Sequence, residues 1–186
     1  MRFRVVLGTA MLALAGSLTF ATSLAAGSGG PIVTARQNSM KEMAAAAKAI
    51  AEMFDGKRGY EPAAFKAAAD ALNVRAGALI REFPQGTLGA PSAARPEIDD
   101  ARPEFEALAR HIGRFADALA NKAGKAPDGI TADMRMTEPP MDGGSLLGKR
   151  PGAAEADPEK MPEEHLLHLI LQDCASCHSK FRQKEK

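Results

Sequence analysis

Four stretches of the chain repeat apolar residues at alternating steps of three and four, and this spacing restricts the fold more than any other feature. Such a stripe covers one face of an α-helix, and helices with one apolar face pack together into a bundle. The stretches cover about residues 31–54, 62–83, 102–123 and 162–183. We therefore predict an all-α protein, an antiparallel up-and-down four-helix bundle.

The ends of the first two stretches carry residues that stop helices. Asp55 and Gly56 follow the first stretch, and Pro84 follows the second. The composition also favours helices over sheets, since hydrophobic residues make up 45% of the chain but aromatic residues only 5%.

The connection between the third and fourth stretches, residues 124–161, is much longer than the about two to eight residues that usually join helices in a bundle. It is rich in Pro, Gly and Asp and shows no apolar period, which favours a flexible loop. It also contains Met134, Met136 and Met141, and clustered thioethers can bind cuprous copper. A copper-handling loop is therefore an alternative function.

Residues 1–25 are predicted to be a secretory signal peptide. Arg2 and Arg4 precede an apolar run, which is followed by small residues up to Ala25. The run is short for a membrane span and is interrupted by glycine, so we expect cleavage without stable membrane insertion. The prediction is a periplasmic protein with one mature bundle domain, residues 26–186.

The mature chain is predicted to be close to neutral. Cleavage would remove two of the 24 basic residues and none of the 23 acidic ones, which changes the formal charge from +1 to −1. This balance excludes a charge-driven nucleic-acid function.

Cys174 and Cys177 are the two cysteines of the chain, and with His178 they form the Cys-Ala-Ser-Cys-His pattern of c-type haem attachment. Residues three apart project from one side of a helix, so both thiols can add to the haem vinyl groups. His178 then lies beneath the iron as its proximal ligand. We predict one haem c, covalently attached within the bundle.

Other uses of these residues are weaker. A thioredoxin-type dithiol would need a strand before the motif, and none is predicted. A structural zinc ion would need a further ligand, and His165 and His168 lie upstream on the same helix, where they would reach the metal only with an awkward bend. A disulfide across two residues would stabilise little. We assign no ligand role to His165, His168 or His111.

The position of the motif, almost at the C-terminus after three other helices, resembles the cytochrome c-prime family of class II c-type cytochromes. The similar segments are Cys174–Arg182, Thr34–Met43, Phe83–Gly86 and Ala94–Ile98. The resemblance covers nearly all of the mature chain except residues 124–161. It implies a four-helix bundle around one haem.

The resemblance also implies roles outside the motif. In this family the position four residues after the first-helix arginine faces the sixth coordination site of the iron, and low-spin members have methionine there. Here the arginine is Arg36 and the methionine is Met40. Arg36 and Arg182, which follows the haem histidine by four residues, are expected near the haem propionates.

A methionine opposite a histidine stabilises ferrous iron and raises the reduction potential, which suits an electron carrier. We therefore expect a periplasmic electron carrier and not an enzyme, with His178 and Met40 as axial ligands and redox proteins as partners. The main alternative is a five-coordinate haem that binds nitric oxide or carbon monoxide, as high-spin relatives do. Relatives commonly form dimers through their first two helices, so a homodimer is a further expectation.

Overall fold

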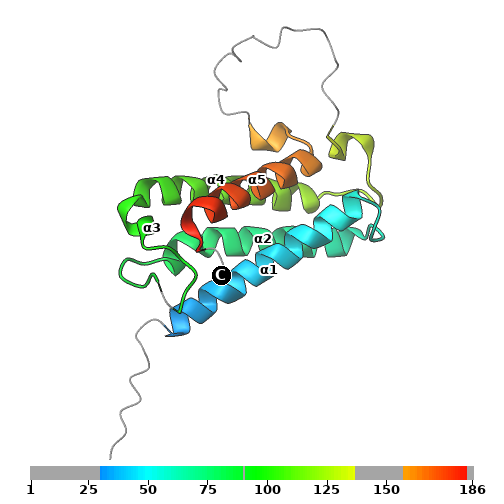
Figure 1. The fold of residues 1–186 in the computed structure, drawn as a ribbon. Coiled ribbons are helices and arrows are strands. Elements are labelled where there is room, and N and C mark those ends of the chain that lie inside the picture. Colours follow the sequence, from blue (N-terminus) through cyan, green and yellow to red (C-terminus); the bar gives the residue numbers. More distant parts are fainter. Residues whose placement is uncertain (1–29, 90, 137–156, 184–186) are drawn as a thin grey trace, which may run out of the picture.

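The computed structural model describes residues 30–89, 91–136 and 157–183, and these form a helical bundle (Figure 1). The long helices are α1 (Gly30–Phe54), α2 (Pro62–Glu82), α4 (Arg102–Ala123) and α5 (Glu163–Phe181). Their ends lie within two residues of the predicted stretches, so the all-α four-helix bundle is confirmed. Three short elements were not predicted: α3 (Glu97–Asp100), η1 (Ala132–Met134) and η2 (Pro158–Lys160).

The residues at the helix ends explain where the long helices stop. Gly56, just after α1, has a φ of 71°, a left-handed conformation that glycine adopts without strain. Pro62 occupies the first turn of α2, where its missing amide hydrogen costs nothing. Pro162 precedes α5, and Glu163 and Glu164 then place negative charge at the positive end of the helix dipole.

The core lies where the apolar faces of the four long helices meet. Helix α1 packs against α2, α2 against α4, and α4 against α5, whereas α1 and α5 contact each other over a shorter stretch. Each long helix contributes a side chain with almost no exposed surface, and these are Ile50, Phe65, Leu119 and Ile170. Burial of these apolar stripes is the main force that holds the helices together.

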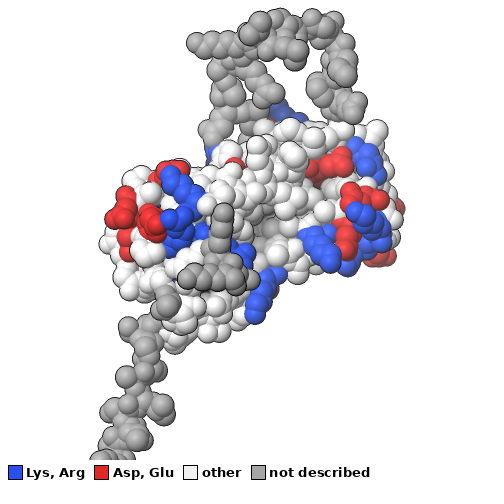
Figure 2. Space-filling model, viewed as in Figure 1, with Lys and Arg blue, Asp and Glu red and all other residues white. Residues whose placement is uncertain are grey.

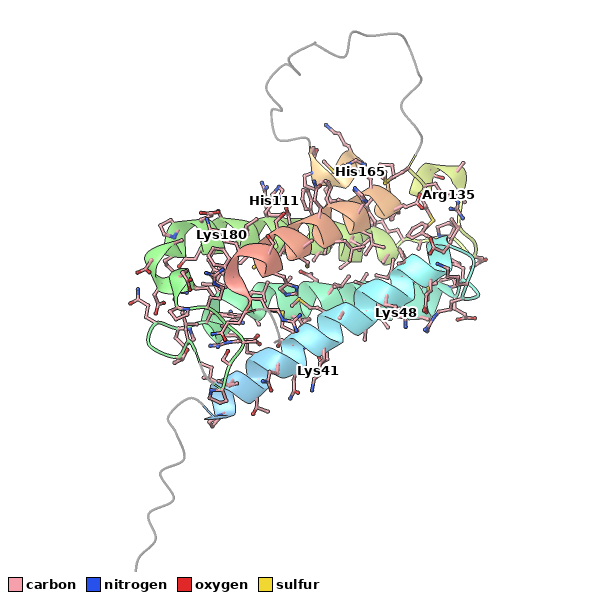
Figure 3. All side chains as sticks on the ribbon, viewed as in Figure 1. Lys41, Lys48, His111, Arg135, His165 and Lys180 are labelled. Atoms are coloured by element: carbon pink, nitrogen blue, oxygen red, sulfur yellow. The ribbon has the colours of Figure 1, made fainter. Side chains whose placement is uncertain are left out.

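The connection after α4 is ordered at least as far as residue 136, which differs from the flexible loop that its composition favours. Met134 has only 1% of its surface exposed, because η1 inserts its side chain into the core. Arg135 donates a hydrogen bond to the Phe54 carbonyl at 3.1 Å, and the Met136 amide donates to the Glu164 carboxylate at 2.7 Å. Residues 131–136 therefore cover the end of the bundle where α1 stops and α5 starts (Figure 3).

Candidate haem site

Helix α5 places both cysteines toward the bundle. Cys174 and Cys177 are half-buried, contact the core and form no disulfide. They lie on the same side of the helix as the buried Ile170 and Phe181, so the three-four spacing predicted their direction correctly. Burial raises the pKa of each thiol from 9.0 to about 11, and the charge of Asp173 adds to the shift. Both side chains are therefore neutral thiols at physiological pH.

His178 lies at the edge of this inward side of α5 and remains exposed. Partial burial lowers its pKa, and the nearby positive charge of Arg182 lowers it further. The ring is thus held in the neutral form that binds metals. Leu171, two helical turns earlier on the same side of α5, leaves 44% of its apolar surface exposed.

A hollow of about 320 Å³ lies between α1 and α5 on this side of the bundle. Ala51 and Phe54 line it from α1, while Leu167 and Leu171 line it from α5. In the view of Figure 2, charged side chains gather toward the two ends of the bundle, and most of the surface between them is uncharged. The hollow itself also has Asp55, Glu164 and His168 in its lining, so it is a mixed apolar and polar site, and it lies about three helical turns from Met40 and His178.

Met40 and His178 are at the same level of the two helices. Met40 precedes Ala51 by eleven residues, which is three turns and about 16 Å, so both lie on nearly the same side of α1. His178 follows Leu167 by eleven residues and is displaced equally far along α5. Because the two helices are antiparallel and Ala51 shares a hollow with Leu167, this register places Met40 and His178 at about the same level along the bundle.

Met40 and Met43 are close together on α1 but differ in how deeply they are buried. Met40 is partly exposed and packs against the rim of the core, whereas Met43 has only 7% of its surface exposed and points into the interior. The donor set between α1 and α5 thus comprises two neutral thiols, one neutral imidazole and one thioether. The two thiols and the imidazole are the side chains that attach and bind a c-type haem.

The structure surrounds Arg36 with protein partners. Its side chain is 3% exposed and lies over the Phe83 ring, 4.2 Å from the centroid. Nε donates to the Glu82 carbonyl at 2.9 Å, Nη1 to Ser92 Oγ at 2.8 Å, and Nη2 to Thr87 Oγ1 at 3.0 Å. With a longer bond from Nη1 to the Thr87 carbonyl at 3.4 Å, these bonds use four of the five N–H donors of the guanidinium, and its contact with a propionate stays a prediction.

Arg182 lies immediately after α5 and is exposed. The Arg182 amide donates a hydrogen bond to the His178 carbonyl at 3.1 Å. The Arg182 backbone also pairs with that of Ala94 in an isolated antiparallel bridge. The positive charge of Arg182 contributes to the lowered pKa of His178. Its contact with a propionate stays a prediction.

His111, to which the sequence assigned no ligand role, joins α4 to α5. Its Nδ1 lies 2.6 Å from Asp173 Oδ2, and its ring packs on Phe115 with centroids 4.3 Å apart. Asp173 directly precedes Cys174, so this bond fixes α4 to the helix beside the attachment motif. The periodicity showed both positions on helices, but it could not show that they meet.

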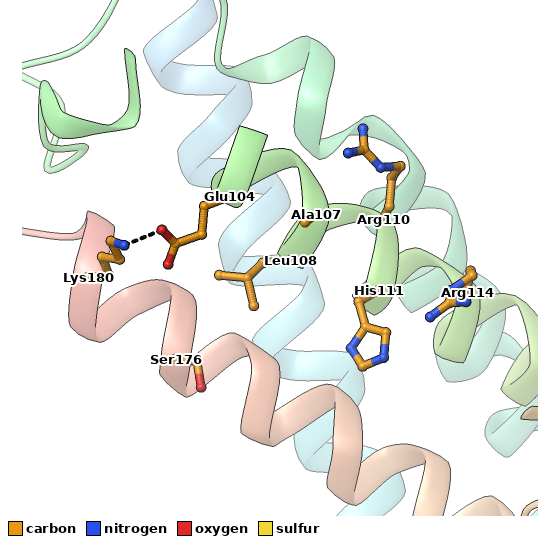
Figure 4. Close-up of a pocket in the computed structure, with 8 residues that line it drawn as sticks. All are labelled: Glu104, Ala107, Leu108, Arg110, His111, Arg114, Ser176 and Lys180. Atoms are coloured by element: carbon orange, nitrogen blue, oxygen red, sulfur yellow. Dashed lines mark hydrogen bonds and ion pairs between the residues drawn. The ribbon is translucent and has the colours of Figure 1, made fainter. Parts of the chain in front are cut away.

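A larger groove, about 670 Å³, lies between α4 and α5 (Figure 4). His111 reaches into it from α4, while Ser176 and Lys180 line it from α5, and Lys180 bonds Glu104. Ser176 and His178 are almost half a turn apart on the helix, so this groove is on the opposite side of α5 from the histidine. This groove between α4 and α5 is therefore not on the side of α5 that carries His178.

Two alternatives from the sequence gain no support from this arrangement. Within the described ranges, no group of three or more His, Cys, Asp or Glu side chains is placed to hold a metal ion. Of the three methionines considered for copper, Met134 is buried in the core, Met136 is exposed and Met141 lies outside the described residues. The Met134 thioether is therefore occupied in packing.

None of the helices in the described part of the chain is long and apolar enough to cross a membrane. The predicted signal peptide lies outside the described residues.

Comparisons with known proteins agree with this fold. A family model described as Cytochrome C' matches residues 31–138. Cytochrome c-556 of Agrobacterium tumefaciens (strain B2A) is 33% identical over 154 residues, which cover 82% of this chain and 98% of that protein. Cytochrome c-556 of Agrobacterium fabrum (strain C58) is 36% identical over 90 residues, 48% of this chain and 61% of that protein.

Solved structures share the fold at lower identity. Cytochrome c prime from Shewanella frigidimarina superposes with a TM-score of 0.60 at 17% identity, covering 84% of this chain and 97% of that one. Cytochrome c' from Thermochromatium tepidum gives a TM-score of 0.56 at 22% identity, covering 82% and 95%. The chain belongs to the cytochrome c' family of class II c-type cytochromes, whose cofactor is a covalently bound haem c.

Proposed function

We propose that this protein is a periplasmic one-electron carrier whose haem is attached through Cys174 and Cys177 and whose iron is bound by His178 and Met40. What supports the proposal is the motif on α5, together with the helix register that puts Met40 and His178 equally far from the hollow shared by Ala51 and Leu167. The family model ends at residue 138, before the attachment motif. The roles of the cysteines therefore rest on the motif, on their inward direction and on the absence of other cysteines from the sequence.

Each proposed residue has a separate task. Cys174 and Cys177 would hold the haem covalently, each thiol adding across one vinyl group so that the sulfur bonds one carbon and the hydrogen goes to the other. His178 and Met40 would hold the iron, through the lone pair of a neutral ring nitrogen and a thioether lone pair. When bound, the haem supplies the one-electron chemistry of iron.

The surrounding side chains set the properties of that iron. Leu167 and Ile170 are buried on the side of α5 that carries the cysteines, and apolar surroundings of this kind would lower the local polarity around the haem. A thioether ligand favours the ferrous state, so the reduction potential should be higher than with water or an empty site. A six-coordinate iron offers no open position to a substrate, and this supports electron transfer over catalysis.

A five-coordinate, gas-binding haem is the second candidate. Cytochrome c prime from Alcaligenes xylosoxidans has been solved with bound nitric oxide, and it superposes here with a TM-score of 0.58, covering 83% of this chain and 94% of that one. Its 19% identity establishes the fold alone. In this chain the candidate would require Met40 to stay off the iron.

A homodimer is proposed in addition to the redox partners. Val74 on α2, one of the first two helices, leaves 66% of its surface exposed and could contact a second copy of the chain. One structural neighbour is described as a cytochrome c' with ligand-controlled dimer dissociation. Sedimentation equilibrium should show a dimer that Val74→Glu converts to a monomer, whereas a monomeric wild type would reject this assembly.

The ligand proposal is tested by replacing each first-helix methionine. Met40→Ala should convert the iron from low-spin to high-spin, accelerate carbon monoxide binding to the ferrous protein and lower the potential. Met43→Ala is the matched control, because Met43 lies less than one turn away but points into the core. If Met43→Ala produces the high-spin spectrum and Met40→Ala does not, the ligand is Met43.

A further inference from the structure

Arg36 and Ser39 hold the first half of α1 to the end of α2 and to the connection that follows it. Arg36 binds the Glu82 carbonyl, Thr87 and Ser92, as described above. Ser39 is 1% exposed and donates to the Glu82 carboxylate at 2.6 Å. These five residues, Arg36, Ser39, Glu82, Thr87 and Ser92, are called the Arg36 clamp below. The clamp begins one helical turn before Met40.

The same connection is bonded to the end of α5. Ser92 Oγ accepts a hydrogen bond from the Ala94 amide at 3.1 Å, which fixes the backbone at this point. The Arg95 amide then donates to the Phe181 carbonyl at 2.9 Å, and the Gln183 amide donates to the Ala93 carbonyl at 2.8 Å. Phe181 is three residues after His178, so the paired segment ends the helix that carries the histidine.

Aromatic contacts provide a second route between the same two points. The Arg36 guanidinium lies over Phe83, and Phe83 packs on Phe105 with ring centroids 5.0 Å apart. Phe105 packs in turn on Phe181 with centroids 5.7 Å apart. Hydrogen bonds and ring contacts thus both connect the Met40 turn of α1 with the His178 turn of α5. Direct contact between α1 and α5 is less extensive.

We propose that Arg36 is a positioning residue for the bond between Met40 and iron. This inference rests on the proposed function and deepens it. The clamp fixes the separation of α1 and α5 at the level of Met40 and His178, and a thioether can bind only if its helix is held at the right distance. Arg36 acts through the protein, because its three nitrogens are already bonded to Glu82, Thr87 and Ser92.

The test compares Arg36→Met, Ser92→Ala and Arg75→Met in the full-length haem protein. Arg36→Met keeps the length of the side chain and removes its donors, while Ser92→Ala cuts the link to the α5-bonded connection without removing a charge. Arg75→Met is the control, since Arg75 joins α2 to Glu42 of α1 at 2.5 Å but does not contact the connection. Spin state, reduction potential, carbon monoxide binding and amide hydrogen exchange are measured for each.

Arg36→Met should become partly high-spin and bind carbon monoxide at least about tenfold faster than the wild type, with a lower potential. Ser92→Ala should change in the same direction by a smaller amount. In both variants the Arg95 and Gln183 amides should exchange faster, since the connection that they bond is loosened. Arg75→Met should match the wild type in all four measurements.

Three results would overturn the proposal. Faster exchange with an unchanged spectrum and potential would make the clamp purely structural. A change in Arg36→Met with none in Ser92→Ala would indicate that the arginine acts by its charge, as a propionate contact would. If the Arg36→Met variant does not take up haem, the spin state and potential of the Ser92→Ala variant test the proposal by themselves. A high-spin wild type would instead reject the proposed ligand, and with it the clamp, before any variant is compared.

Discussion

The raised pKa of the two cysteines predicts that the folded apoprotein is alkylated slowly. Both thiols have a pKa of about 11, against 9.0 for an ordinary thiol, because they are buried against the core. Iodoacetamide reacts with the thiolate only. At pH 8 about 10% of an ordinary thiol is ionised, but only about 0.1% of these, so the folded chain should react about 100-fold more slowly than the unfolded chain.

The assay follows the mass of the apoprotein in excess iodoacetamide from about pH 7.5 to about pH 9.5, with circular dichroism confirming the helices at each pH. Urea-denatured protein is the control. The folded chain should react about tenfold faster for each pH unit over the whole range, whereas the denatured chain should level off above about pH 9. If steric cover alone slowed alkylation, the rate for the folded chain would be low but would level off at the same pH as the rate for the denatured chain. Such a profile would refute the argument from burial.

The remaining predictions concern stability and attachment. The unfolded apoprotein binds fewer thiol protons than the folded one between pH 9.0 and about 11, so urea melts should show its stability falling as pH rises through this range. Cys177→Ala should lower the yield of protein with covalent haem, measured by mass spectrometry after acid-acetone extraction. Met134→Ala should destabilise the protein by about 2–5 kcal/mol because the side chain is 1% exposed, while Met136→Ala, 42% exposed, should change it by less than about 0.5 kcal/mol in the same melts.

Much of the fold could be predicted because the relevant signals are local. The apolar period of three and four is a property of each helix alone, and it placed Ile50, Phe65 and Ile170 in the core. Stop signals act on the residues beside them, as Gly56 does with its positive φ. The same period gave the inward direction of Cys174 and Cys177. Helix number, helix ends and the face of the attachment motif therefore followed from sequence.

The features that could not be predicted depend on contacts between distant segments. Arg36 bonds Ser92, which is 56 residues further along the chain, and a pair at that separation leaves no periodic trace in the sequence. The His111–Asp173 bond joins two helices in the same way. Met134 stands in a segment whose composition is typical of a loop, and its burial arises from packing against the end of the bundle. Such contacts are set by tertiary structure and not by local propensity.

The absorption spectrum of the wild-type haem protein, recorded in both oxidation states, tests the central claim most directly. Coordination by both His178 and Met40 predicts low-spin iron when ferric and when ferrous, with a weak far-red sulfur-to-iron band in the ferric form. It also predicts that the ferrous protein binds carbon monoxide poorly. A high-spin ferric spectrum without that band, together with ready carbon monoxide binding, would contradict methionine ligation and establish the five-coordinate gas-binding haem in its place.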